Sequence, residues 1–156
     1  MRGLAAAATC LALLTSACAP SGPEGVDTAV LDEMVGRAVG DPSTCVLLAE
    51  RNTGDIVYRY GTHMTCSRTL PACQGGGTLT VNALKDAAAK GDERAISCPS
   101  LPDGSTTVGW ASGPVKPGPG AKYGQLVYAA VMEGERALPG REIKLRLEGA
   151  LRRAGM

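Results

Sequence analysis

Apolar residues recur every three or four positions in three parts of the chain, which is the spacing of a helix with one buried face. The first such segment spans residues 28–39; Asp27 or Thr28 can cap its start, and Gly40 stops it. The second follows Thr80, whose hydroxyl suits a helix cap, and ends at Gly91. The third lies near the C-terminus, with Pro139 expected in its first turn. We therefore expect three amphipathic helices.

The C-terminal segment also fits a strand, because apolar and polar residues alternate over residues 143–147. Its high content of Arg, Glu, Lys, Leu and Ala favours a helix instead. The pairs Glu142–Arg146 and Glu148–Arg152 are spaced four residues apart, which adds to that preference.

Five further segments have the alternating or continuously apolar pattern of strands: residues 44–50, 55–60, 95–100, 106–111 and 125–133. Gly54 predicts a hairpin between the first two, because glycine adopts the positive φ that tight turns require. Pro99 predicts an edge position for the third strand, since proline donates no hydrogen bond to a neighbour. The last strand is the most apolar and is expected at the centre of the sheet. The Gly- and Pro-rich segment 113–120 predicts a loop.

The resulting order, α-β-β-α-β-β-β-α, predicts an α+β fold with about five antiparallel strands in one sheet, flanked by three helices. One domain over residues 27–156 accommodates it. This order is similar to that of the profilin-like group and of the α/β half of serine β-lactamases and penicillin-binding proteins. Such a resemblance implies a fold rather than an activity.

The N-terminus has the layout of an export signal. Arg2 precedes an apolar run over residues 4–14, which is too short to span a membrane. The end of the segment, Ser16-Ala17-Cys18, resembles the lipobox of bacterial lipoproteins, although Thr15 replaces the usual leucine.

The lipobox resemblance implies that residues 1–17 are a signal peptide and that Cys18 receives a diacylglycerol with palmitate-type chains. Residues 18–26 then form the lipidated cysteine and a flexible Pro- and Gly-rich tether. The expected location is the bacterial cell envelope, on a membrane and facing the periplasm. Export without lipidation, as a soluble periplasmic protein, is the second choice.

The charge balance bears on the expected partners, and the aromatic content bears on the composition of the core. The chain carries 16 Lys and Arg against 15 Asp and Glu without a basic block, so nucleic acid is not an expected partner. It has no Phe and one Trp, so Tyr58, Tyr60, Trp110 and Tyr128 are expected to supply most of the bulky core. A core of this composition gains from covalent cross-links.

Four cysteines follow Cys18, and an even number in an exported domain favours disulfide bonds. Three pairings are open. The short spacing of Cys66 and Cys73 favours a local bridge, which leaves Cys45 to pair with Cys98.

Serine acyl-transfer chemistry has weak support in the sequence. A β-lactamase-like nucleophile needs a lysine three residues further on, but Leu70 stands there after Ser67. A Ser-His-Asp triad would have to use His63, which is the sole histidine. No catalytic residue is therefore expected.

A second interpretation of the segment around His63 is metal binding. His63, Met64, Cys66 and Cys73 form a set of soft ligands that suits Cu(I). The two cysteines are favoured as a disulfide, so neither a metal nor a cofactor is expected.

Two other groups of residues are candidates for contact or chemistry. Trp110 and Tyr123 flank the Pro-rich loop and would form a contact patch if exposed, or part of the core if buried. Glu133, Glu135 and Arg136 gather at a strand-to-helix junction, where carboxylates suit acid–base work or simply a solvated corner.

These observations predict a non-catalytic cell-envelope lipoprotein whose small domain binds an envelope protein, a ligand or the cell wall. The alternatives are an envelope hydrolase, distantly like the α/β half of β-lactamases, and a Cu(I)-binding envelope protein.

Overall fold

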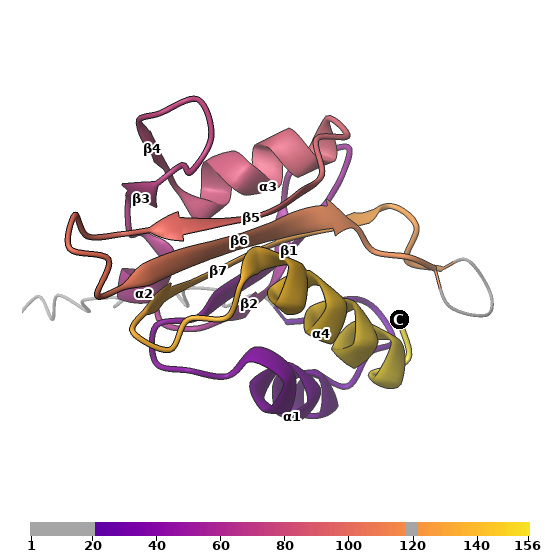
Figure 1. Ribbon diagram of the computed structural model, residues 1–156. Coiled ribbons are helices and arrows are strands. Elements are labelled where there is room, and N and C mark those ends of the chain that lie inside the picture. Colours follow the sequence, from indigo (N-terminus) through magenta and orange to yellow (C-terminus); the bar gives the residue numbers. More distant parts are fainter. Residues whose placement is uncertain (1–20, 118–121) are drawn as a thin grey trace, which may run out of the picture.

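The computed structural model describes residues 21–117 and 122–156 (Figure 1). The predicted signal peptide and the predicted lipidation site Cys18 lie outside the described residues. The elements of the described chain, in order, are α1 (Thr28–Val39), β1 (Cys45–Glu50), β2 (Ile56–Tyr60), α2 (His63–Cys66), β3 (Leu70–Pro71), β4 (Thr78–Leu79), α3 (Val81–Ala89), β5 (Arg94–Pro99), β6 (Thr107–Pro114), β7 (Leu126–Gly134) and α4 (Gly140–Arg153).

Five of the strands form one antiparallel sheet in the order β2-β1-β7-β6-β5. This confirms the predicted α+β fold, with the apolar strand β7 at the centre and the Pro99-containing strand β5 at an edge. Helix α2 and the small β3–β4 sheet were not predicted, because elements of four and two residues are too short to leave a periodic pattern.

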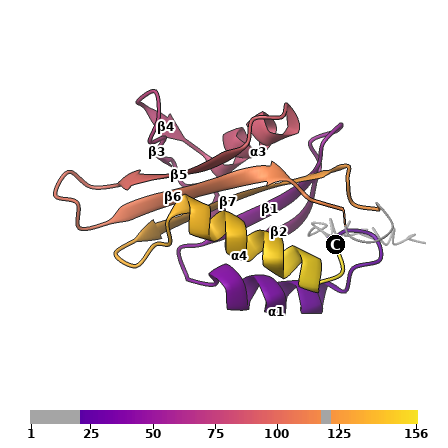
Figure 2. The ribbon, with the colours of Figure 1, turned by 45° about the vertical axis from the view of Figure 1, so that its right-hand side comes forward.

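Successive side chains of the sheet point to opposite faces, and each face is covered by a different layer. Leu48 and Tyr128 belong to the core beneath α1 and α4, whereas Leu47 and Trp110 belong to the core beneath α3. Figure 1 shows α1 and α4 on one side of the sheet and α3 with β3 and β4 on the other. The turned view in Figure 2 shows α1 and α4 running side by side.

The helices begin where the sequence predicted. Asp27 caps α1, since its Oδ1 accepts a hydrogen bond from the backbone N–H of Ala29 at 2.9 Å. Thr80 caps α3 in the same way. The ambiguous C-terminal segment is a helix, and the predicted pair of Glu142 and Arg146 is present at 2.7 Å.

Two details near the predicted Pro-rich loop and the last helix differ from expectation. Strand β6 continues through Pro114, which pairs with Val127 of β7, whereas a loop was predicted from residue 113. Proline is tolerated there because β5 begins at Arg94, opposite Ser112, so the part of β6 beyond Ser112 lies at an edge. Pro139 precedes α4 as its cap residue instead of occupying the first turn.

Both disulfides pair differently from the prediction. The bonds are Cys45–Cys66 and Cys73–Cys98, not Cys66–Cys73 and Cys45–Cys98. Helix α2 packs against β1 and so brings Cys66 to Cys45. The chain then turns away through β3 and carries Cys73 to the edge strand β5. Spacing in the sequence was a poor guide because α2 holds Cys66 against β1, whereas β3 leads Cys73 away toward β5.

Candidate functional site

Trp110 and Tyr123 do not form the contact patch that was considered for them. Trp110 is completely buried, and its Nε1–H donates to the backbone oxygen of Pro71 at 2.8 Å. It therefore serves the core, which was the alternative for this residue. Tyr123 is half-buried, and its hydroxyl donates to the backbone oxygen of Glu24 at 3.2 Å. The two aromatic residues thus do not form one patch.

Ser67 and His63 lie near each other but are not arranged as a nucleophile and base. Both are exposed at α2 and line a hollow of about 200 Å³ together with Arg59 and Asn82. The Ser67 hydroxyl donates to the backbone oxygen of Met64 at 3.1 Å. A general base must accept that proton from the nucleophile, so this geometry gives His63 no such role.

The soft-ligand cluster is also broken up. Cys66 and Cys73 belong to different disulfides, and a disulfide sulfur lacks the thiolate charge that binds metals. Among the residues that the structure describes, no group of three His, Cys, Asp or Glu side chains is placed to hold a metal ion.

A polar depression lies at the C-terminal end of β7. We call it the distal hollow; its volume is about 430 Å³. Its lining comes from the α1–β1 loop, from α2 and the segment after α2, from the end of β7 and from the β7–α4 turn. The lining residues are Asp41, Pro42, Ser43, Thr65, Arg68, Glu133, Gly134, Glu135, Arg136 and Ala137. The sequence analysis singled out Glu133, Glu135 and Arg136 as a cluster. It gave no signal for Asp41, Thr65 or Arg68.

Glu133 is the centre of the polar contacts in the distal hollow. Its side chain is 15% exposed. Its Oε2 accepts a hydrogen bond from Arg68 at 2.7 Å, and its Oε1 accepts one from the Ser100 hydroxyl at 2.8 Å. Burial alone would raise the pKa of Glu133, but the bonds from Arg68 and Ser100 outweigh burial and lower the pKa. Glu133 is therefore a fixed carboxylate at neutral pH.

A second carboxylate of the distal hollow is held by its own loop. The Oδ1 atom of Asp41 accepts hydrogen bonds from the backbone N–H and the hydroxyl of Ser43, at 2.9 and 2.7 Å. These bonds, with a smaller contribution from the charge of Arg136, lower the pKa of Asp41. The distal hollow thus presents carboxylates and guanidinium groups together, in positions that the backbone defines.

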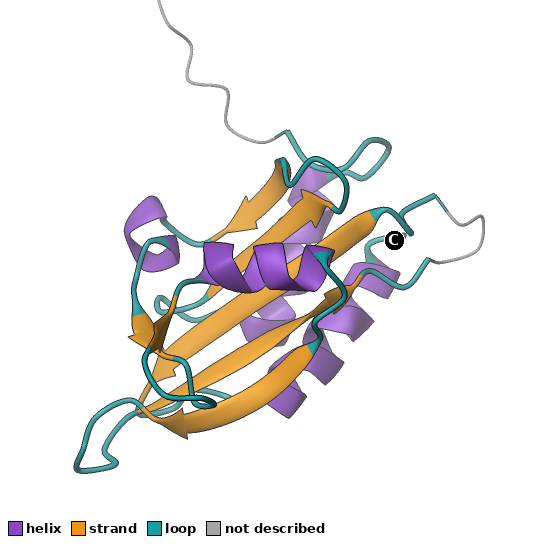
Figure 3. Cartoon of the chain, turned by 90° about the horizontal axis from the view of Figure 1, so that it is seen from above, coloured by secondary structure: helices purple, strands orange, loops and turns teal. Residues whose placement is uncertain are grey.

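Two large apolar side chains are exposed beside the distal hollow. Met64 is 76% exposed and precedes Thr65, while Leu101 is 48% exposed and follows Ser100, the partner of Glu133. The loop that carries Leu101 projects from the sheet at the lower left of Figure 3. We call this end of the molecule, with Met64, Leu101 and the distal hollow, the distal end.

The disulfides brace both segments that carry these exposed side chains. Met64 lies two residues before Cys66, and Leu101 lies three residues after Cys98. The Leu101 loop is further closed by a turn in which the Gly104 N–H donates to the Leu101 carbonyl at 3.0 Å. Covalent bracing of this kind reduces the entropy that a loop loses on binding.

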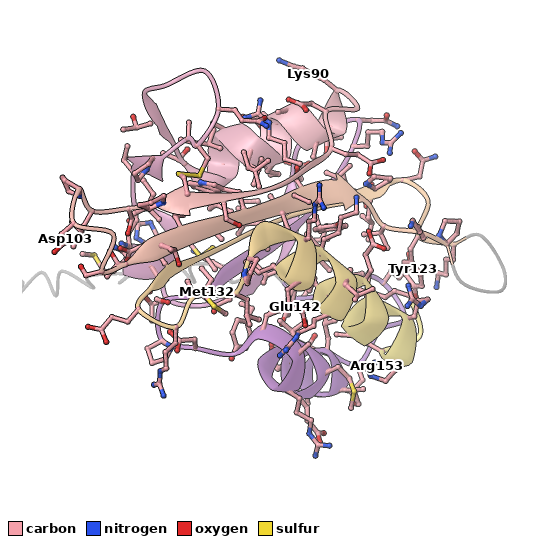
Figure 4. All side chains as sticks on the ribbon, viewed as in Figure 1. Lys90, Asp103, Tyr123, Met132, Glu142 and Arg153 are labelled. Atoms are coloured by element: carbon pink, nitrogen blue, oxygen red, sulfur yellow. A yellow bond between two sulfur atoms is a disulfide. The ribbon has the colours of Figure 1, made fainter. Side chains whose placement is uncertain are left out.

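The N-terminal segment occupies the opposite end of the sheet. The Gly22 N–H donates to the Val57 carbonyl at 3.0 Å, and Glu24 accepts the bond from Tyr123 described above. Residues 21–25 of the expected tether therefore contact the domain. Figure 4 shows Tyr123 and Asp103, which belongs to the Leu101 loop, at opposite ends of the molecule. The nine residues of β7 separate these ends by about 30 Å.

No family model matches this chain, and neither a curated protein nor a solved structure is significantly similar to it. In the described part of the chain, no helix is both long enough and apolar enough to cross a bilayer.

Proposed function

We propose that this chain is an exported, lipid-anchored bacterial protein that binds another envelope protein through its distal end. The observation that carries the proposal is the bracing of two exposed apolar side chains, Met64 and Leu101, by two separate disulfides around one polar hollow. Disulfides persist in the oxidising compartments outside the cytoplasm, which supports export.

The position of the N-terminal segment supports the orientation that such binding needs. Cys18 is the proposed lipidation site, and Ser21 follows it by three residues, a span of at most about 10 Å. The segment from Ser21 contacts the end of the sheet opposite to the distal hollow. A membrane anchor at Cys18 would then leave the distal end facing away from the bilayer, where a partner protein can reach it.

The distal end offers the chemistry of a protein contact more than that of a small-ligand pocket. Leu101 on its projecting loop is an apolar anchor that fits a pocket on a partner, and buried anchors of this kind supply most of the binding energy of protein interfaces. Arg68, Glu135 and Arg136 line the distal hollow with charge of both signs. We expect a partner with an apolar pocket rimmed by charged groups.

Photo-cross-linking in living cells tests the proposal. Leu101→benzoylphenylalanine and Met64→benzoylphenylalanine are expected to form the same covalent adduct with one envelope protein. The matched control is Leu145→benzoylphenylalanine, since Leu145 is 66% exposed but lies on α4, away from the distal hollow. Equal adducts from all three positions, or none from Leu101, would refute the proposed binding surface.

A hydrolase remains the second candidate, because His63 and Ser67 share a hollow with the cation Arg59. Substrate binding would have to turn the Ser67 hydroxyl away from Met64 and toward His63 before this pair could act.

A further inference from the structure

The two disulfides lie in very different surroundings. Cys45 and Cys66 are 0% and 6% exposed and belong to the core beneath α3. Cys73 and Cys98 are only half-buried, at the tip of the β3–β4 hairpin and on the edge strand β5. Cys73 and Cys98 pack against the rim of the same core, so the second disulfide is the more exposed of the two. We expect a soluble thiol to reach it without unfolding of the domain, whereas the first disulfide is enclosed.

The backbone around Cys73 is held in an unfavourable conformation. Cys73 has a φ of 66°, and in the described chain it is the one non-glycine residue with positive φ. Left-handed backbone is disfavoured for residues with a Cβ. The following glycines, Gly75, Gly76 and Gly77, also have positive φ, and a Cβ built on any of them would meet no atom within 4 Å. The hairpin tip at Cys73 is thus both strained and open.

The contacts around this disulfide allow it to open locally. The Ala72 N–H still donates to the Gly77 carbonyl at 3.1 Å, and Trp110 still donates to Pro71. These bonds hold the base of the β3–β4 hairpin without the disulfide. The main sheet and the enclosed Cys45–Cys66 bond do not depend on it.

We propose that Cys73–Cys98 is a thiol–disulfide exchange site, whose co-reactant is a dithiol protein of the compartment to which the chain is exported. Exposed or strained disulfides are the more oxidising and more labile ones. A thiolate of the dithiol attacks one sulfur, so that a mixed disulfide forms and the other cysteine leaves as a thiolate that takes up a proton. The second thiol of the co-reactant then displaces the cysteine still bound. The products are two protein thiols and one oxidised dithiol.

The exchange would act on the Leu101 loop, because Cys98 lies at its base. Reduction releases β5 from the β3–β4 hairpin and leaves the loop held by its own turn, by Ser100 and by the pairing of β5 with β6. Exchange at Cys73–Cys98 does not require the distal end to be a binding surface. An experiment that refutes one of the two proposals therefore leaves the other intact.

Stepwise reduction of the purified, oxidised protein with dithiothreitol tests whether Cys73–Cys98 is the more accessible disulfide. After alkylation of the free thiols, peptide mass mapping is expected to find Cys73 and Cys98 modified at least about a hundredfold faster than Cys45 and Cys66, because opening the enclosed bond requires unfolding. The circular dichroism spectrum of the half-reduced protein should match that of the oxidised protein, which would show that the fold persists. Simultaneous opening of both bonds, or earlier opening of Cys45–Cys66, would overturn the proposal.

A trapping experiment tests the protein co-reactant. A thioredoxin-fold oxidant or reductant with its Cys-x-x-Cys site changed to Cys-x-x-Ser cannot resolve the mixed disulfide. It is expected to form a covalent adduct on Cys73 or Cys98 and none on a Cys73→Ser/Cys98→Ser double variant. If dithiothreitol opens the bond but no adduct forms on these two cysteines, the bond is merely exposed and the proposed exchange with a dithiol protein is wrong.

Discussion

Helix α4 contains two glycines for which the structure predicts opposite effects of the same substitution. Helix propensity alone favours alanine over glycine at both Gly140 and Gly149, by up to about 1 kcal/mol. At Gly140, however, a Cβ would lie far inside contact distance of the backbone oxygens of Trp110 and Ile96. At Gly149 the nearest atom is the end of the flexible Arg153 side chain, at 3.3 Å.

The backbone that faces Gly140 cannot yield cheaply, because Trp110 and Ile96 belong to the paired strands β6 and β5. The Gly140 N–H also donates to the Ser97 hydroxyl at 2.7 Å, which fixes the start of α4 on the sheet. Overpacking against atoms that cannot turn away costs about 1–3 kcal/mol or more. We therefore expect Gly140→Ala to lower the free energy of unfolding by about 3 kcal/mol and Gly149→Ala to raise it by about 0.5–1 kcal/mol.

Urea unfolding followed by tryptophan fluorescence measures both effects, since Trp110 is the sole tryptophan and is buried. With an m-value of about 2 kcal/mol/M, the midpoint should fall by about 1.5 M for Gly140→Ala and rise slightly for Gly149→Ala. The disulfides must stay oxidised in every sample. A Gly140→Ala protein as stable as the parent would refute the close approach of α4 to β5 and β6.

Four other predictions address the packing of the core, the stability at acid pH, the lipid anchor and the reactivity of Ser67. Trp110→Phe should destabilise the protein by about 1–3 kcal/mol in thermal unfolding, because the Pro71 carbonyl loses its buried donor; no loss would mean that water replaces the indole. Glu133 has a lowered pKa, so its contribution to stability is present above its ordinary pKa of 4.5 and is lost as the pH falls below that value. Glu133→Gln should accordingly flatten the acid side of the stability curve, and an unchanged slope would contradict the bonds from Arg68 and Ser100. Cys18→Ser should abolish partitioning into detergent, and a variant that still partitions has another anchor. A fluorophosphonate should leave Ser67 unlabelled; stoichiometric labelling that Ser67→Ala abolishes would establish the hydrolase instead.

Local patterns determined most of the elements of this fold. The apolar period over residues 28–39, the capping residues Asp27 and Thr80, and the composition after Pro139 identified three helices at their observed places. The apolar run of β7 identified the central strand. Such features could be predicted because capping, propensity and one-sided burial act between residues that are close in the sequence.

The partners of distant residues were decided only by the tertiary structure. Arg68 and Glu133 are 65 positions apart, and their ion pair exists because α2 and the end of β7 meet at one end of the sheet. The burial of Trp110 depends on which face of β6 lies under α3. No local pattern carries this information.

The disulfides also depend in part on local sequence and in part on tertiary structure. The even count and the export segment together indicated disulfides, and the described chain contains two. Which cysteines pair depends on where α2 and the β3–β4 hairpin carry them, and both elements are too short to be predicted from periodicity. A sequence therefore specifies that cross-links form, while the packing of the chain specifies which sulfur atoms come within bonding distance.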